Sequence, residues 1–194
     1  MKKFFYIFIA LMICSLSCYA DKNNKNAKIV IDNMLERVSV RQYSDKKIEQ
    51  EKIDTILKAA MSAPSGMNRQ PWEIIVVNDK EKLAAIADAT PNARYSKDSQ
   101  VTIIVCGDTK VSDKLWMQDC CAVTENILLA AQALDLGAVW CMCYPKQENI
   151  SAVQEICKLP KNVVPLSIIP IGYPAAKQEA KQKYNPDKIH INEW

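Results

Sequence analysis

Two arginines and a serine at alternate positions, Arg37, Ser39 and Arg41, form the pattern in this sequence that most directly suggests chemistry. In an extended segment the side chains alternate between the two sides of the backbone, so these three would share one side while Val38 and Val40 face the other. Two guanidinium groups beside a hydroxyl match the oxygens of a phosphate dianion, because arginine binds such oxygens in a bidentate manner. Taken alone, the pattern is also typical of solvated arginines beside an edge strand.

A second candidate site is the loop between Ala63 and Trp72, which has the sequence APSGMNRQPW. Its two prolines exclude a regular helix, and Gly66 permits a close approach of the backbone to a ligand. Serine, asparagine and glutamine side chains supply hydrogen-bonding groups, so the loop suits a flat, polar ligand with several functional groups. An ordinary turn between a helix and a strand would have a similar composition.

The elements that must position these two sites follow one another along a chain of 194 residues, which is long enough for one domain with a substantial core. Apolar residues at helical spacing predict helices over residues 27–37, 53–61, 80–87, 113–136 and 149–157. Gly137 is expected to end the fourth helix as its C′ residue. Short apolar runs predict strands over residues 74–77, 101–106, 138–143 and 163–172, and residues 90–99 read as a long polar connection.

The first 20 residues have the pattern of a secretory signal peptide. Two lysines precede the apolar run 4–16, which is too short to span a bilayer comfortably, and small residues lead to Ala20. We expect cleavage after Ala20, export to the periplasm or cell envelope, a polar disordered spacer over residues 21–28 and the folded domain over residues 29–194. Cys18 offers the alternative of a lipoprotein that is anchored to the membrane through that cysteine.

Charge and histidine content argue against other classes of function. Removal of the first 20 residues lowers the formal net charge from +3 to +1, because it takes away two lysines and no acidic residue. A near-neutral domain gives no support for a nucleic acid partner. The only histidine, His190, lies in a polar tail and is a poor candidate for a general base, so the sequence predicts no catalytic side chain.

The six cysteines beyond the signal region lie in apolar stretches, where free cysteine behaves as a small hydrophobic residue. They have neither the spacing nor the histidine partners of a typical metal site. We therefore expect no metal, and unpaired, buried thiols at Cys106, Cys120, Cys121, Cys141, Cys143 and Cys157.

Five short motifs occur in order between Ile29 and the C-terminus. They are Arg37-x-Ser39-x-Arg41, the loop from Ala63 to Trp72, Leu136-Gly137-Ala138-x-Trp140, Pro170-Ile-Gly172-Tyr-Pro174, and a lysine-rich tail that ends near His190 and Trp194. Together they make the chain resemble the FMN-dependent nitroreductase family. The resemblance implies an α+β fold with a mainly antiparallel central sheet flanked by helices, assembled as an intertwined homodimer with arms that cross between the subunits.

The resemblance also implies which residues contact the cofactor. Those implied to hold the FMN phosphate are Arg37, Ser39, Arg41, Lys181 and Lys183. Those implied to meet the flavin of the other subunit are Pro64, Ser65, Gly66 and Asn68. Met142 and Cys143 belong to a segment whose backbone would lie against the flavin ring, although Met142 replaces the glycine that the family usually has there.

The mechanism that the resemblance implies is ping-pong. NAD(P)H, or another donor, would reduce FMN and leave, and a nitroaromatic compound, a quinone or a similar small molecule would then take the hydride. Export keeps a second hypothesis open, because nicotinamide donors are scarce outside the cytoplasm. In that alternative the chain is a flavin-binding protein of the envelope that carries electrons without a turnover of its own.

Overall fold

The computed structural model describes residues 24–194 as two compact units, which divide between Glu36 and Arg37. The first unit contains a helix over residues 24–36, in which Lys28 Nζ lies 2.5 Å from Asp32 Oδ2 one turn later. Residues 24–28, expected to belong to a disordered spacer, are therefore helical, and the i,i+4 ion pair supports this conformation. The predicted signal peptide lies outside the described residues, so export and the cleavage site remain predictions.

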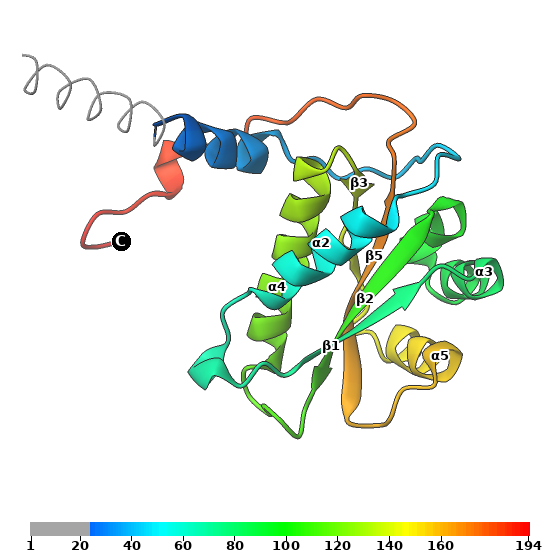
Figure 1. Cartoon of the computed structure of the whole chain (residues 1–194). Coiled ribbons are helices and arrows are strands. Elements are labelled where there is room, and N and C mark those ends of the chain that lie inside the picture. The colour runs from blue at the N-terminus through cyan, green and yellow to red at the C-terminus, as the bar shows by residue number, and fades with distance from the viewer. Residues whose placement is uncertain (1–23) are drawn as a thin grey trace, which may run out of the picture. The chain divides into compact units, whose positions relative to one another are not determined.

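The second unit is built on a five-stranded sheet. Its strands are β1 (Trp72–Val77), β2 (Val101–Asp108), β3 (Gly137–Ala138), β4 (Cys141–Met142) and β5 (Val163–Gly172). The strand order is β1-β2-β5-β3, β4 also pairs with β5, and every pair is antiparallel (Figure 1). The predicted α+β fold with a mainly antiparallel sheet is thus confirmed, whereas the strand predicted over residues 138–143 is divided into the short β3 and β4.

Helices cover both faces of this sheet (Figure 1). The helices α2 (Gln50–Met61) and α4 (Trp116–Ala133) share one core cluster with Ile103 and Val105 of β2. The helices α3 (Lys80–Ala89) and α5 (Gln147–Cys157) share the other cluster with Ile104 and Cys106. Because successive side chains of a strand point to opposite faces, β2 supplies both cores, and this explains its nearly continuous apolar sequence.

The C-terminal end of α4 differs from the prediction. The helix ends at Ala133, and Asp135 adopts the left-handed conformation, with φ of 59°, that was expected of Gly137. Aspartate tolerates this region better than most residues because its short side chain can bond locally. Gly137 instead begins β3 and pairs with Gly172 of β5.

Two polar segments complete the second unit. The connection expected over residues 90–99 contains the 3₁₀ helix η2 (Pro91–Asp98). The tail from residue 177 onward contains one short 3₁₀ helix, η3 (Pro186–Lys188), and its side chains are exposed. Within this tail the rings of His190 and Trp194 stack with centroids 4.2 Å apart.

All six cysteines of the described chain are free, and four of them are buried: Cys106, Cys120, Cys141 and Cys143. The prediction of buried thiols is wrong for Cys121 and Cys157, which are only partly buried. Residues 24–194 contain no cluster of histidine, cysteine and acidic side chains that could hold a metal ion. In the same part of the chain, no helix combines the length and the apolarity that crossing a membrane requires.

Candidate functional site

The segment around Ser39 runs beside the sheet in an extended conformation. Ser39 forms a parallel bridge with Ala138, and the Val40 N–H donates to the Ala138 carbonyl at 2.9 Å. The side chain of Val40 is buried, whereas Arg41 is exposed. The expected alternation of buried and exposed side chains is therefore present at Val40 and Arg41. One side of the segment packs on the domain, and the other is left for a ligand.

The tail returns to this segment and closes a pocket with it. The Tyr43–Pro174 bridge and a 3.0 Å hydrogen bond from the Ala175 N–H to the Gln42 carbonyl tie the two stretches together. Beyond them lies a pocket of about 380 Å³. The residues that line it are Arg37, Val38, Ser39, Arg41, Gln178, Glu179, Lys181 and Lys183. All five residues predicted to hold a phosphate thus meet in one place.

The charges of this pocket suit an anion. Four of its side chains are cationic and one, Glu179, is acidic. Arg37 Nε lies 3.8 Å from Glu125 Oε1. The hydrogen bond that the Arg41 side chain makes with the described residues is long, 3.4 Å from its Nη1 to the Ser39 carbonyl. Within residues 24–194 neither Lys181 nor Lys183 forms a salt bridge with its side chain. The excess of unpaired cations fits a dianionic phosphate, which takes charge-assisted hydrogen bonds from such groups.

A second pocket, of about 530 Å³, shares Ser39 and Arg41 with the first and brings in Arg94 and Tyr95 of η2. The guanidinium carbons of Arg41 and Arg94 lie 5.9 and 4.5 Å from the centroid of the Tyr95 ring. Neither η2 residue was predicted from the sequence, because the segment has no apolar periodicity. An arginine next to a tyrosine in a polar connection was the available signal, since this pair offers charge and a flat face together.

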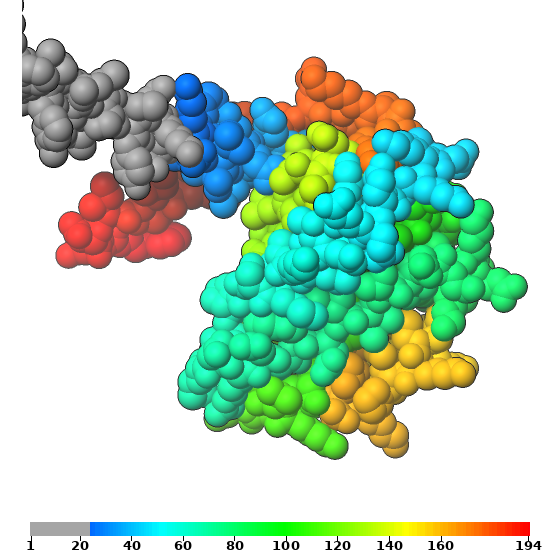
Figure 2. All heavy atoms as spheres, in the orientation of Figure 1, coloured from blue at the N-terminus to red at the C-terminus, as the bar shows by residue number. Residues whose placement is uncertain are grey.

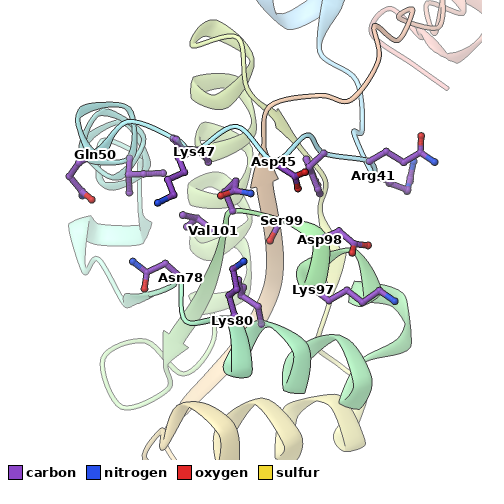
Figure 3. A pocket seen from close by; sticks show the side chains of 16 residues that line it. Arg41, Asp45, Lys47, Gln50, Asn78, Lys80, Lys97, Asp98, Ser99 and Val101 are labelled. Carbon is purple, nitrogen blue, oxygen red and sulfur yellow. The ribbon is translucent and has the colours of Figure 1, made fainter.

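A third pocket, of about 700 Å³, has Arg41 at its edge (Figure 3). The side chains of Lys47 and Lys80 reach into its hollow, and Asp45 and Asn78 also line it. Its floor is partly apolar, and no residue predicted from the sequence other than Arg41 takes part in it. Arg41 lines each of these three pockets.

The loop between Ala63 and Trp72, which was predicted to meet the flavin, lies away from these pockets. It contains a 3₁₀ turn, η1 (Gly66–Asn68), although no helix was expected between its two prolines. Figures 1 and 2 show the loop at the opposite end of the unit from the segment around Arg41. None of Pro64, Ser65, Gly66 and Asn68 lines a pocket with Arg41.

The two remaining candidates differ from one another. Met142 is 56% exposed, and its carbonyl accepts a hydrogen bond from the Asn92 side chain. Cys143 is completely buried, and its N–H donates to the Leu166 carbonyl at 2.9 Å. Met142 therefore remains accessible to a ligand, whereas Cys143 offers neither its side chain nor its N–H in this structure.

Comparison with known proteins agrees with the geometry. The model of the nitroreductase family matches residues 34–93 and 91–173. A protein of Archaeoglobus fulgidus, provisionally named an NADH dehydrogenase/NAD(P)H nitroreductase, is 44% identical over 164 residues, which cover 81% of this chain and 94% of that protein.

Two solved structures extend the comparison to the fold. A protein of Bacteroides thetaiotaomicron with the same provisional name is 48% identical, has a TM-score of 0.83 and aligns over 85% of this chain and 98% of its own. The FMN-dependent nitroreductase of Clostridium difficile R20291 is 31% identical, has a TM-score of 0.80 and aligns over 84% of this chain and 99% of its own. The sequence matches and the fold agree, and the chain belongs to the nitroreductase family.

Proposed function

We propose that this chain is an FMN-dependent oxidoreductase that takes electrons from NAD(P)H and passes them to a small-molecule acceptor such as a nitroaromatic compound or a quinone. The observation that carries the proposal is the pocket in which Arg37, Arg41 and the two tail lysines meet around Ser39. The relatives described above are named for NAD(P)H nitroreductase or FMN-dependent nitroreductase activity, which supports the same reaction class.

The first pocket fits the phosphate of FMN. Arg37 and Arg41 would bind the phosphate oxygens with their planar guanidinium groups, and Ser39 would donate its hydroxyl hydrogen. Lys181 and Lys183 come from a tail that is otherwise exposed, so the phosphate would also hold this part of the tail against the domain.

The second pocket suits the ring system of the cofactor. When bound, FMN supplies the two-electron transfer between NAD(P)H and the acceptor. Negative charge develops at the pyrimidine end of a flavin on reduction, and Arg94 would stabilise it from its position over the Tyr95 ring. No side-chain nucleophile is required, in keeping with the prediction of no catalytic residue.

A homodimer would complete the site. The loop that contains Ser65 and Asn68 lies at the far end of its own unit, so a flavin held beside Arg41 could meet such a loop only from a second subunit. The exposed apolar side chains of the tail, such as Ile191 at 82% exposure and Trp194 at 101%, support an arm that packs on a partner.

We further propose that the chain acts outside the cytoplasm, because residues 1–20 have the pattern of a signal peptide. This location favours the alternative of an electron carrier that has no turnover of its own with NAD(P)H. If the chain is anchored at Cys18, it would act at the membrane surface.

The visible spectrum of the purified protein, with and without NADH or NADPH, tests these proposals. A yellow protein whose flavin bands bleach on addition of either nucleotide and return with a quinone supports the enzyme. Yellow protein that bleaches with dithionite but with neither nucleotide supports the electron carrier. A colourless protein that takes up no FMN in a titration would contradict both.

A further inference from the structure

Asp119 is a buried carboxylate with an incomplete set of hydrogen bonds. It lies in the first turn of α4 and is 6% exposed. Its Oδ1 accepts the N–H of Gly66 at 2.9 Å, and its Oδ2 has no hydrogen-bond partner among the described residues. Burying a carboxylate that has a single hydrogen bond costs free energy. This cost suggests that the one bond which the Asp119 carboxylate makes among the described residues, to the Gly66 N–H, has a function.

The loop that Asp119 holds is strained. Met67, Asn68 and Gln70 have φ angles of 54°, 53° and 49°, in the left-handed region that residues other than glycine adopt at a cost. Inside the loop, the Gln70 N–H donates to Ser65 Oγ at 3.0 Å, and Gln70 Nε2 donates to Asn68 Oδ1 at 2.9 Å. These bonds close the loop on itself but do not attach it to the rest of the domain.

The attachment comes from the start of α4. Besides its bond to Asp119, Gly66 packs so closely on Leu115 that an added Cβ would lie 2.4 Å from Leu115 Cδ1. Leu115 and Asp119 are themselves joined by a helical hydrogen bond of 3.0 Å. One helical turn therefore supplies both a packing surface and a directional bond, and the bond comes from Asp119.

We propose that Asp119 is the positioning residue of the loop 65–70. Its carboxylate anchors the Gly66 N–H and thereby fixes the strained conformation in which Ser65 and Asn68 are presented. That this conformation serves the flavin of a second subunit rests on the proposed function, whereas the anchoring itself does not. Asp119 acts through the loop and is not expected to touch cofactor or substrate.

Amide hydrogen exchange tests the anchoring in the full mature chain without added flavin. Asp119→Leu keeps the bulk but removes the acceptor, and we expect the Gly66 amide to exchange at least about tenfold faster. Asp119→Asn keeps an acceptor oxygen, so exchange should stay within about twofold of the wild type. If Asp119→Leu does not fold, Asp119→Ala gives the same comparison.

Thr124→Val is the matched control, because Thr124 is buried in the same helix and its Oγ1 donates to the Cys120 carbonyl at 2.8 Å. This substitution removes that bond and the 2.8 Å bond between Thr124 Oγ1 and Ser167 Oγ. It does not touch the loop and should leave Gly66 exchange unchanged. Equal exchange in the wild type and Asp119→Leu, or equally fast exchange in Thr124→Val, would overturn the anchoring.

The visible circular dichroism of FMN-saturated protein tests whether the anchored loop serves the flavin of a second subunit. We expect an altered flavin band in Asp119→Leu, and wild-type bands in Asp119→Asn and Thr124→Val. Faster loop exchange with an unchanged flavin band would mean that the anchored loop does not serve the flavin. A wild-type chain that binds no FMN would refute the proposed function, and the exchange measurement would still decide whether Asp119 anchors the loop.

Discussion

A methyl group added to Gly137 would lie 2.6 Å from the Cβ of Val40, which is much closer than two non-bonded carbons can approach. Val40 stands between Ser39 and Arg41, and its N–H is bonded to the residue after Gly137. The absence of a side chain at Gly137 therefore lets the segment of the phosphate pocket lie directly on the edge of the sheet.

We expect Gly137→Ala to displace this segment. The substitution should lower the free energy of unfolding by about 1–3 kcal/mol, because no side chain at this contact can yield without moving the backbone. Urea denaturation measures the stability, and fluorescence titration measures FMN affinity, which should fall as well. Val40→Ala removes two of the three clashing carbons, so the double variant should recover part of both losses. Wild-type stability of Gly137→Ala would contradict this account.

Arg41→Ala should weaken FMN binding. Hydrogen bonds to a charged group contribute about 1.5–3 kcal/mol, so their loss should raise the Kd for FMN by a factor between about ten and somewhat more than a hundred. Lys161→Ala is the control, because Lys161 is an exposed cation outside the three pockets. Equal FMN affinity of the two variants in a fluorescence titration would show that the pocket does not hold the phosphate.

Mixed dimers should reveal a site that is shared between subunits. Arg41→Ala damages the phosphate pocket and Asn68→Ala damages the loop, so each homodimer should be defective at both of its sites. In a mixed dimer one of the two sites would combine an intact pocket with an intact loop, so each mixed dimer formed from the differently tagged variants should have about half of the wild-type activity. Pull-down of both tags shows whether mixed dimers have formed. If they have formed but no activity returns, the pocket and the loop do not belong to one shared site.

The buried thiols should make stability depend on pH in the alkaline range. Burial raises the pKa of Cys120 and of Cys143 to about 12, from an ordinary value of 9.0. The unfolded chain therefore loses these protons first as the pH rises above about 9, and stability falls until the folded pKa is reached. Each thiol should contribute a slope of about 1.4 kcal/mol per pH unit between those values.

Urea denaturation between pH 8 and 11 measures this slope. Cys143→Ala should reduce the slope by about the contribution of one thiol, whatever the substitution does to the stability at neutral pH. Cys121 is only partly buried, so Cys121→Ala should flatten it less. Parallel curves for the wild type and Cys143→Ala would show that the thiol ionises equally easily in the folded chain.

Local patterns predicted much of the fold. The apolar run of β5 was expected with the observed bounds, and the alternation around Ser39 agrees with the side on which Val40 is buried. The first prediction depends on a continuous apolar run and the second on the period of two along an extended chain, and both patterns are visible in the sequence itself. The predicted phosphate ligands of the tail were reached only through the resemblance, because no local pattern places Lys181 beside Arg41.

Other features depended on contacts between distant segments. Asp135 rather than Gly137 follows α4 in the left-handed conformation, because Gly137 is needed where Val40 approaches. Arg94 lies in a polar segment that gave no periodic signal, and its proximity to Arg41 is set by tertiary packing. The same holds for Asp119, which reads as an ordinary polar residue of a long helix until the loop at Gly66 is in place.

The order in which the strands are synthesised differs from their order in the sheet. β5 is the last strand of the chain, yet it pairs with β2, β3 and β4 and so joins most of the sheet together. The growing chain therefore cannot close its sheet until residues up to Gly172 have left the ribosome. An export signal at the N-terminus would be exposed throughout that time, so a translocation machinery that accepts only unfolded chains would meet this protein before its fold could form.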